Sequence, residues 1–283
     1  KKDYTGINGG AIAKAEEIIG VPDVVISDYE PISAEYAYKH SAPLVTIDQQ
    51  SKYLVGEFPA ELHGQTYVDE IVRLKMFFPT AAMRIACSFF DVTKKEGSEE
   101  ALLVPPIFKD SILNMKNNPT SLSSVLVYFS SQQEFPQSIE EVIPICLSQP
   151  GIQFHFFLPN AEERSSSENI IFYKHGDQGF GDVLRNCSGI ISTAGHTLLS
   201  EAMYLGIPVY AIPLAVYEQQ MNAEIIDKNG FGVMSETINE ERLIYFISNL
   251  ARFREAIKTN HDVLLRGNGK EKIIEFLESR YLS

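Results

Sequence analysis

Residues 188–234 decide the fold; they read SGIISTAGHTLLSEAMYLGIPVYAIPLAVYEQQMNAEIIDKNGFGVM. Their apolar spacing predicts a buried strand over 189–192, a turn of small side chains at 193–195 and a helix over 196–205. Gly206 ends this helix, and a second apolar strand follows it. A strand, a helix and a strand in this order predict two parallel strands joined by a crossover helix.

The turn at 193–195 is suited to bind an anion. Small side chains let the backbone approach a ligand closely, and the N–H groups of the first helical turn favour a negative charge by about 0.3–1 kcal/mol. Phosphate is the expected ligand. The residues predicted to contact it are Thr193, Ala194, Gly195, His196 and Thr197. For His196, an ordinary polar contact at the helix start remains an alternative.

Glu201 lies four residues after Thr197, so both side chains project from the same face of the predicted helix. A helix glutamate usually faces solvent. Here the helix and its flanking strands are otherwise apolar, and a buried carboxylate needs hydrogen-bond donors to offset its desolvation. We therefore expect Glu201 to accept hydrogen bonds from two hydroxyl groups of a ligand.

Polar side chains also gather where the next helix is predicted to begin. Glu218, Gln219 and Asn222 bring acceptors and amide donors together within five residues. Sugar hydroxyls both donate and accept hydrogen bonds, so this cluster is suited to a sugar.

At these residues the chain resembles the donor-binding half of glycosyltransferases with the B-type fold. The resemblance is to glycosyltransferase family 28, which includes the N-acetylglucosaminyltransferase that forms lipid II, and to the UDP-glucuronosyltransferases. It implies two Rossmann-like domains facing a cleft and transfer of a hexose-type sugar from a UDP-sugar. It assigns the diphosphate to the 193–195 turn, the ribose hydroxyls to Glu201, and the sugar to Glu218, Gln219 and Asn222.

A less characterised prokaryotic branch of family 28 is similar over more of the chain, from about residue 22 to about residue 233. Its members carry a Gly-Phe pair before a helix and a PDxxISDxEP segment. Here these read Gly179-Phe180 and PDVVISDYEP, at 22–31. This likeness implies that Phe180 lies beside the nucleobase.

The length of the chain and the segments that interrupt regular structure predict two α/β domains. A chain of 283 residues with 45% hydrophobic side chains is long for one domain. Pro105-Pro106 and the polar segment 114–124 predict a boundary near residue 118. We expect an acceptor-side domain over 1–118 and a donor-binding domain over 119–283, whose last helix returns to the first domain.

The first half shows a βαβ rhythm from Val24 to Ile47, which predicts parallel strands. Relatives with the B-type fold begin this domain with a strand and a glycine-rich turn, followed by a histidine that serves as general base. Nothing before Val24 matches these features. We therefore expect the first domain to be incomplete at its N-terminus, with a segment truncated, absent from the structure or supplied by another chain.

Inverting transfer needs a base for the acceptor hydroxyl. Asp28 and Glu30 follow a predicted strand directly, where ligands bind in open parallel sheets, and are the predicted catalytic residues. Asp28 capping a turn and Glu30 facing solvent are the alternatives. His63 and His196 are further candidates for the base. Ser130 and Ser131 are expected either to face the diphosphate or to cap a helix.

Composition excludes several other functions. The net charge of −13 argues against a nucleic-acid partner. No apolar run reaches the roughly 20 residues that cross a bilayer. Three widely spaced cysteines indicate neither a zinc site nor a disulfide framework, and no Asp-x-Asp metal motif occurs. We expect a metal-independent reaction with no cofactor beyond the UDP-sugar substrate.

The acceptor and the transferred sugar are not encoded in any recognisable motif. We expect a cytoplasmic protein, peripheral at the inner face of the membrane if its acceptor is lipid-linked. Two alternatives remain: a noncatalytic donor-binding subunit of a split glycosyltransferase, and a nucleotide-sugar epimerase.

Overall fold

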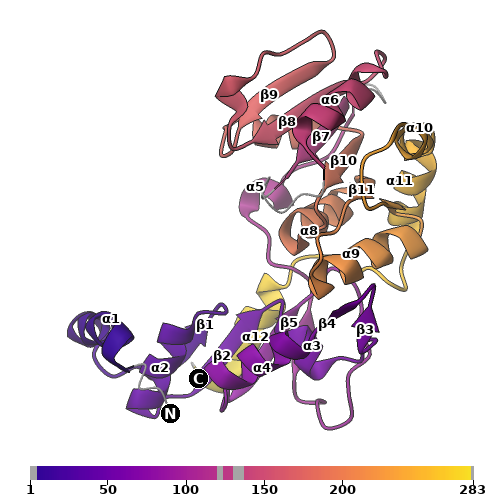
Figure 1. The fold of residues 1–283 in the computed structure, drawn as a ribbon. Helices are drawn as coiled ribbons and strands as arrows, with labels where there is room; N and C mark the ends of the chain where they lie inside the picture. Colours follow the sequence, from indigo (N-terminus) through magenta and orange to yellow (C-terminus); the bar gives the residue numbers. More distant parts are fainter. Residues whose placement is uncertain (1–4, 120–123, 130–136, 282–283) are drawn as a thin grey trace. The chain divides into compact units, whose positions relative to one another are not determined.

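The computed structural model describes residues 5–119, 124–129 and 137–281. These residues form two compact units, drawn in Figure 1. The first unit comprises the residues up to Ala60, Tyr67–Ile107 and those from Gly267 onward, and the second comprises Glu61–Thr66 and Phe108–Arg266. The chain therefore passes between the units four times.

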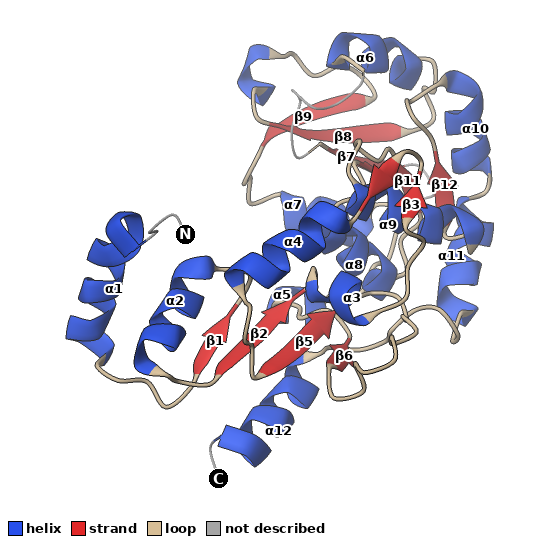
Figure 2. Ribbon diagram, turned by 60° about the horizontal axis from the view of Figure 1, so that its bottom comes forward, coloured by secondary structure: helices blue, strands red, loops and turns tan. Residues whose placement is uncertain are grey.

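The first unit is a parallel sheet with helices on both faces, which Figure 2 shows in red and blue. Its strands, in spatial order, are β1 (Val25–Ser27), β2 (Leu44–Asp48), β5 (Met83–Cys87) and β6 (Leu102–Val104). Its helices are α1 (Thr5–Ile19), α2 (Pro31–His40), α3 (Ser51–Val55), α4 (Val68–Phe77) and α12 (Lys270–Tyr281). All three strand pairings are parallel.

Consecutive residues of β2 belong to different cores, because side chains alternate across a strand. Leu44 packs with Ala34 of α2 and Leu74 of α4. Val45 packs with Ile85 of β5 and with Ile273 of α12. The last helix of the chain thus covers one face of the first sheet.

The second unit is a larger parallel sheet. Its strands, in spatial order, are β12 (Gly232–Met234), β11 (Val209–Ala211), β10 (Gly189–Ser192), β7 (Ser124–Tyr128), β8 (Gln153–Leu158) and β9 (Ile170–Lys174). Its helices are α5 (Asp110–Leu113), α6 (Ile139–Leu147), α7 (Phe180–Asn186), α8 (His196–Leu205), α9 (Tyr217–Lys228), α10 (Glu240–Ser248) and α11 (Leu250–Thr259). The strand and the helix predicted at 189–192 and 196–205 are confirmed as β10 and α8.

The segment from Phe108 onward belongs to the second unit because it packs on α8. The ring centroids of Phe108 and Tyr204 lie 4.7 Å apart, and the Tyr204 hydroxyl donates to the Leu113 carbonyl at 3.4 Å. The chain therefore enters the second unit between Ile107 and Phe108, ahead of residue 118.

A small hairpin also belongs to the second unit. It pairs β3 (Glu61–Leu62) with β4 (Gln65–Thr66) in antiparallel fashion, and His63 and Gly64 at its tip both have positive φ. His63 Nε2 lies 2.5 Å from Glu224 Oε1 of α9. This contact fixes the hairpin tip on α9.

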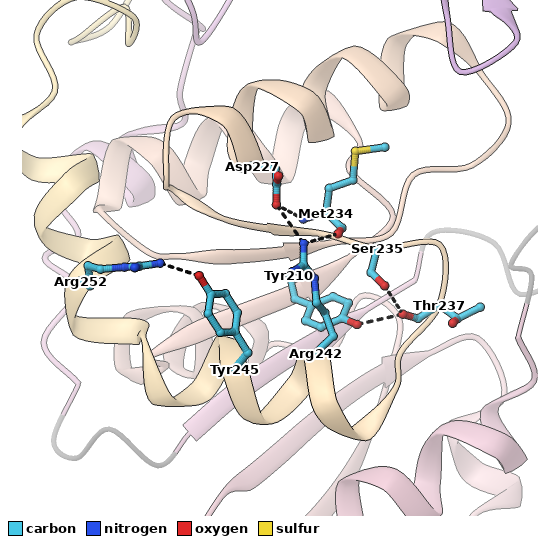
Figure 3. Close-up of polar contacts among 8 residues, drawn as sticks. All are labelled: Tyr210, Asp227, Met234, Ser235, Thr237, Arg242, Tyr245 and Arg252. Carbon is cyan, nitrogen blue, oxygen red and sulfur yellow. Dashed lines mark hydrogen bonds and ion pairs between the residues drawn. The ribbon is translucent and has the colours of Figure 1, made fainter.

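A polar network fastens β12 to the helices beside it, as Figure 3 shows. One carboxylate oxygen of Asp227 accepts from the Met234 N–H at 2.9 Å and from Arg242 of α10 at 3.4 Å. The Tyr210 hydroxyl of β11 donates to the Thr237 carbonyl at 2.9 Å. The Asp227 carboxylate and the Tyr210 hydroxyl therefore both have hydrogen-bond partners within the second unit.

Candidate functional site

The order of the second sheet marks one edge as the place for a ligand. From β7 the chain adds β8 and β9 on one side, and then returns to add β10, β11 and β12 on the other side. The direction of winding thus reverses between β7 and β10. In open parallel sheets, ligands bind outside the carboxyl ends of strands at such a switch point.

The turn at 193–195 lies directly at this switch point, between β10 and α8. Ala194 is fully buried and has φ 59°, in the left-handed region. Gly195 is the N-cap residue of α8, and as a glycine it has no side chain of its own to cap the helix. A Cβ atom on Gly195 would meet nothing within 4 Å, so the space around it is open.

The first helical turn offers donors to that space. The N–H groups at the start of a helix have no partner inside the helix. Thr197 is exposed and His196 is half-buried at the same end of α8. The residues predicted to bind phosphate are therefore brought together, around an open helix N-terminus that can accommodate an anion.

Asn222 of α9 contacts this turn directly. Its Nδ2 donates to the Ala194 carbonyl at 3.0 Å, and its side chain is 0% exposed. Within the described part of the chain, its Oδ1 has no hydrogen-bond partner. The amide predicted to contact a sugar is thus engaged with the backbone of the turn.

Glu218 and Gln219 lie in the first turn of α9, and both are half-buried. The Gln219 side-chain oxygen accepts from the Leu214 N–H at 2.9 Å, and Gln220 Nε2 donates to the Leu214 carbonyl at 3.0 Å. The two amides therefore brace the loop between β11 and α9. An amide that accepts through its oxygen still carries two N–H donors.

Glu201 projects from α8 about one turn beyond Thr197 and is half-buried. Burial raises the pKa of this carboxyl group, and the ammonium of Lys109 lowers it in part. A carboxylate that is partly removed from water is a stronger hydrogen-bond acceptor for ligand hydroxyls than an exposed one.

Aromatic rings cluster at the carboxyl ends of β7, β8 and β9. Phe180 opens α7, and its ring lies 5.0 Å from that of Phe157 and 5.8 Å from that of Tyr128. Tyr128 stacks on His175, with ring centroids 4.9 Å apart and planes inclined by 20°. Sequence reasoning missed Tyr128, although an aromatic residue within the apolar run at 125–129 was a usable signal.

In the first unit, Glu30 is the N-cap of α2. Its two carboxylate oxygens accept from the N–H groups of Ile32 at 2.9 Å and Ser33 at 2.7 Å. Asp28 follows β1 and is exposed. Of the two predicted catalytic residues, Glu30 is therefore the one that caps a helix.

The sequence analysis missed Asp48, the last residue of β2. Its side chain is 3% exposed and accepts from the Ser51 N–H at 2.5 Å and from the Ser51 hydroxyl at 3.0 Å. Burial raises its pKa, and the charge of Asp28 adds to this effect. An aspartate directly after an apolar strand was the available signal.

The remaining predicted site residues, Ser130 and Ser131, lie outside the described residues. Within the described ranges, no group of three or more His, Cys, Asp or Glu side chains is arranged to hold a metal ion. No helix in the same ranges has the length and apolar character to cross a membrane.

The family model described as glycosyl transferase family 1 matches residues 13–251. A search of curated proteins gives no match.

Solved structures of glycosyltransferases share the fold. UGT89C1 of Arabidopsis thaliana aligns with 99% of this chain and 77% of its own, at 14% identity and a TM-score of 0.66. UGT2 of Phytolacca americana aligns with 98% of this chain and 79% of its own, at 13% identity and a TM-score of 0.65. The glycotransferase of kitacinnamycin aligns with 90% of this chain and 74% of its own, at 14% identity and a TM-score of 0.63. The predicted fold, two Rossmann-like α/β domains of the B type, is confirmed.

Proposed function

The chain belongs to glycosyl transferase family 1, and from this premise we propose that it transfers a hexose-type sugar from a UDP-sugar to an acceptor. The proposed reaction is inverting and independent of metal ions. Its acceptor hydroxyl is deprotonated by a base, and the developing negative charge moves onto the departing UDP.

One observation carries the proposal: an uncapped helix N-terminus lies at the switch point of the second sheet, beside a left-handed turn. We assign the diphosphate to the turn and the first helical residues. These residues are Thr193, Ala194, Gly195, His196 and Thr197. The backbone dipoles there favour the charge of the leaving group, which supports a mechanism without a metal ion or other cofactor.

The rest of the donor extends from this point in both directions. Glu201 is proposed to accept hydrogen bonds from the ribose hydroxyls, and the aromatic rings around Phe180 to flank the nucleobase. Glu218 and Gln219 are proposed to contact the sugar. The choice of UDP is supported by two related structures, UGT2 of Phytolacca americana with UDP-2fluoro-glucose and LpCGTa with UDP.

On the acceptor side, we retain Asp28 as a candidate base because it is exposed at the carboxyl end of β1. Glu30 is a weaker candidate, since both of its oxygens already accept backbone hydrogen bonds.

The finer likeness to family 28 also belongs to this proposal. It suggests a lipid-linked acceptor, in which case the enzyme works in the cytoplasm at the inner face of the membrane. The strongly acidic composition of the chain argues against a nucleic-acid partner.

Isothermal titration of the purified protein with UDP, ADP and GDP tests the proposal. We expect selective binding of UDP, weakened in Glu201→Ala by about 1–3 kcal/mol, or roughly 5- to 150-fold, the effect of losing a hydrogen bond to a charged group. Glu241→Ala, at an exposed glutamate of α10, is the matched control and should bind like the wild type. Absence of nucleotide binding in the wild type, or an unchanged affinity in Glu201→Ala, would contradict the proposal.

A further inference from the structure

The hydrogen bond between Asn222 and Ala194 joins two parts of the donor site. Ala194 belongs to the turn before α8, and Asn222 lies in the second turn of α9. The bond, from Asn222 Nδ2 to the Ala194 carbonyl at 3.0 Å, spans 28 residues of sequence and is buried. This bond fixes the position of the turn relative to α9. The sequence of the turn alone does not specify that position.

The turn needs such support, because Ala194 adopts a conformation that residues with a Cβ atom avoid. Its φ of 59° lies in the left-handed region, which costs roughly 1–2 kcal/mol for a residue other than glycine. Its buried carbonyl also requires a donor, since an unpaired backbone group away from water is destabilising. The Asn222 amide satisfies the carbonyl and holds the left-handed turn in place.

Asn222 is too buried to contact the proposed sugar. With 0% of its side chain exposed and its amide nitrogen engaged with Ala194, it presents no exposed group to a ligand. Glu218 and Gln219 lie one turn earlier on the same helix. The bond therefore links the residues proposed for the sugar to the turn proposed for the diphosphate.

We propose that Asn222 is a positioning residue: it holds Ala194 in the left-handed conformation that directs the N–H groups at the start of α8 toward the diphosphate. This inference rests on the proposed donor site and replaces the expected contact between Asn222 and the sugar.

The experiment is a rescue measured by titration with UDP and with UDP-glucose. Asn222→Ala should lower the affinity for both ligands to the same extent, by about 10-fold, because the diphosphate is common to them. Adding Ala194→Gly should recover at least about threefold of the affinity, since glycine adopts positive φ without support. Ala194→Gly alone should bind within about threefold of the wild type.

A second variant guards against misfolding. Asn222→Leu keeps the size of the side chain and removes the donor, and it should show the same loss and the same rescue. Thermal unfolding of each unliganded variant confirms that folded protein is titrated.

The inference is overturned if adding Ala194→Gly to Asn222→Ala restores no affinity. It is also overturned if Asn222→Ala weakens the binding of UDP-glucose while UDP binds as it does to the wild type. Both results would return Asn222 to a local structural role or to a sugar contact, and both leave nucleotide binding by the wild type intact. If the wild type binds neither ligand, the proposed function fails and this inference fails with it.

Discussion

The carboxyl edges of the two sheets use their polar groups in opposite ways. In the first unit, the Glu30 carboxylate accepts from the N–H groups at the start of α2, and the Asp48 carboxylate accepts from Ser51. In the second unit, Gly195 leaves the start of α8 without a capping side chain. One edge holds Glu30 and Asp48 in hydrogen bonds to its own chain, whereas the other is the edge where we propose that backbone donors bind an anion.

Both edges nevertheless contain a strained residue. Tyr29 in the first unit has φ 51°, and Ala194 in the second has φ 59°. Such conformations persist only where surrounding contacts enforce them, and they concentrate at functional sites. Tyr29 separates exposed Asp28 from the capping residue Glu30, and Ala194 precedes the open N-cap. The proposed donor edge is thus preorganised for charge, whereas on the other edge Glu30 and Asp48 are held by hydrogen bonds to their own chain.

The largest effect is expected where a carboxylate is placed on the donor edge. Gly195→Asp should lower UDP affinity by at least about 100-fold, because its charge would occupy the anion site at the helix N-terminus. Stability should stay within about 0.5 kcal/mol of the wild type or rise, since aspartate is a favoured N-cap. A Cβ atom at this position also meets nothing within 4 Å. Titration with UDP and thermal unfolding measure the two quantities.

Gly195→Asn is the matched control, because it caps the helix with a neutral side chain of the same size. It should lose much less affinity than the aspartate variant. Equal losses in the two variants would show that size, not charge, is responsible. Wild-type affinity in Gly195→Asp would contradict an anion site on this edge.

The next effect concerns Asp48 on the first edge. Asp48→Ala leaves the buried N–H and hydroxyl of Ser51 without their acceptor, and should lower the free energy of unfolding by about 1–3 kcal/mol. Asp48→Asn retains an oxygen acceptor and should keep most of this stability. Denaturant unfolding of both variants tests the difference. Equal stability of Asp48→Ala and Asp48→Asn would show that the hydrogen bonds to Ser51 contribute little.

The pH dependence of Asp48→Asn sharpens this test. Burial is the main cause of the raised pKa of Asp48, so the folded state holds its proton more tightly than the unfolded state does. The stability contributed by protonated Asp48 is therefore lost as pH rises through the folded pKa. The asparagine variant does not titrate, so its stability relative to the wild type should rise as pH increases above about 4. A constant difference between pH 4 and 7 would contradict a raised pKa.

Sequence reasoning succeeded where local signals agree. For α8, apolar spacing and Gly206 fixed both the helix and its end, and the helix begins at His196 as predicted. Sequence reasoning identified no elements between β2 and α4. The structure has α3 and the β3–β4 hairpin there. A helix of five residues is unstable alone and depends on tertiary contacts.

The site shows the same limit. The turn proposed to bind phosphate could be located in the sequence because Thr193, Ala194 and Gly195 are contiguous and precede a helix. The contact between Asn222 and Ala194 could not, because it joins residues 28 positions apart. The capping role of Glu30 was within reach. Pro31 follows it directly, and proline in the first helical position identifies the preceding residue as the N-cap.

The smallest effect is expected at that cap. Glu30→Ala removes the acceptor for the N–H groups of Ile32 and Ser33, and should lower the free energy of unfolding by about 1 kcal/mol. Glu30→Asp should retain most of the stability, because aspartate is itself a favoured cap. UDP affinity should be unchanged in both variants, since the donor is assigned to the other edge. An alanine variant as stable as the wild type would mean that Glu30 is not needed as an anchor, and would restore it beside Asp28 as a candidate base.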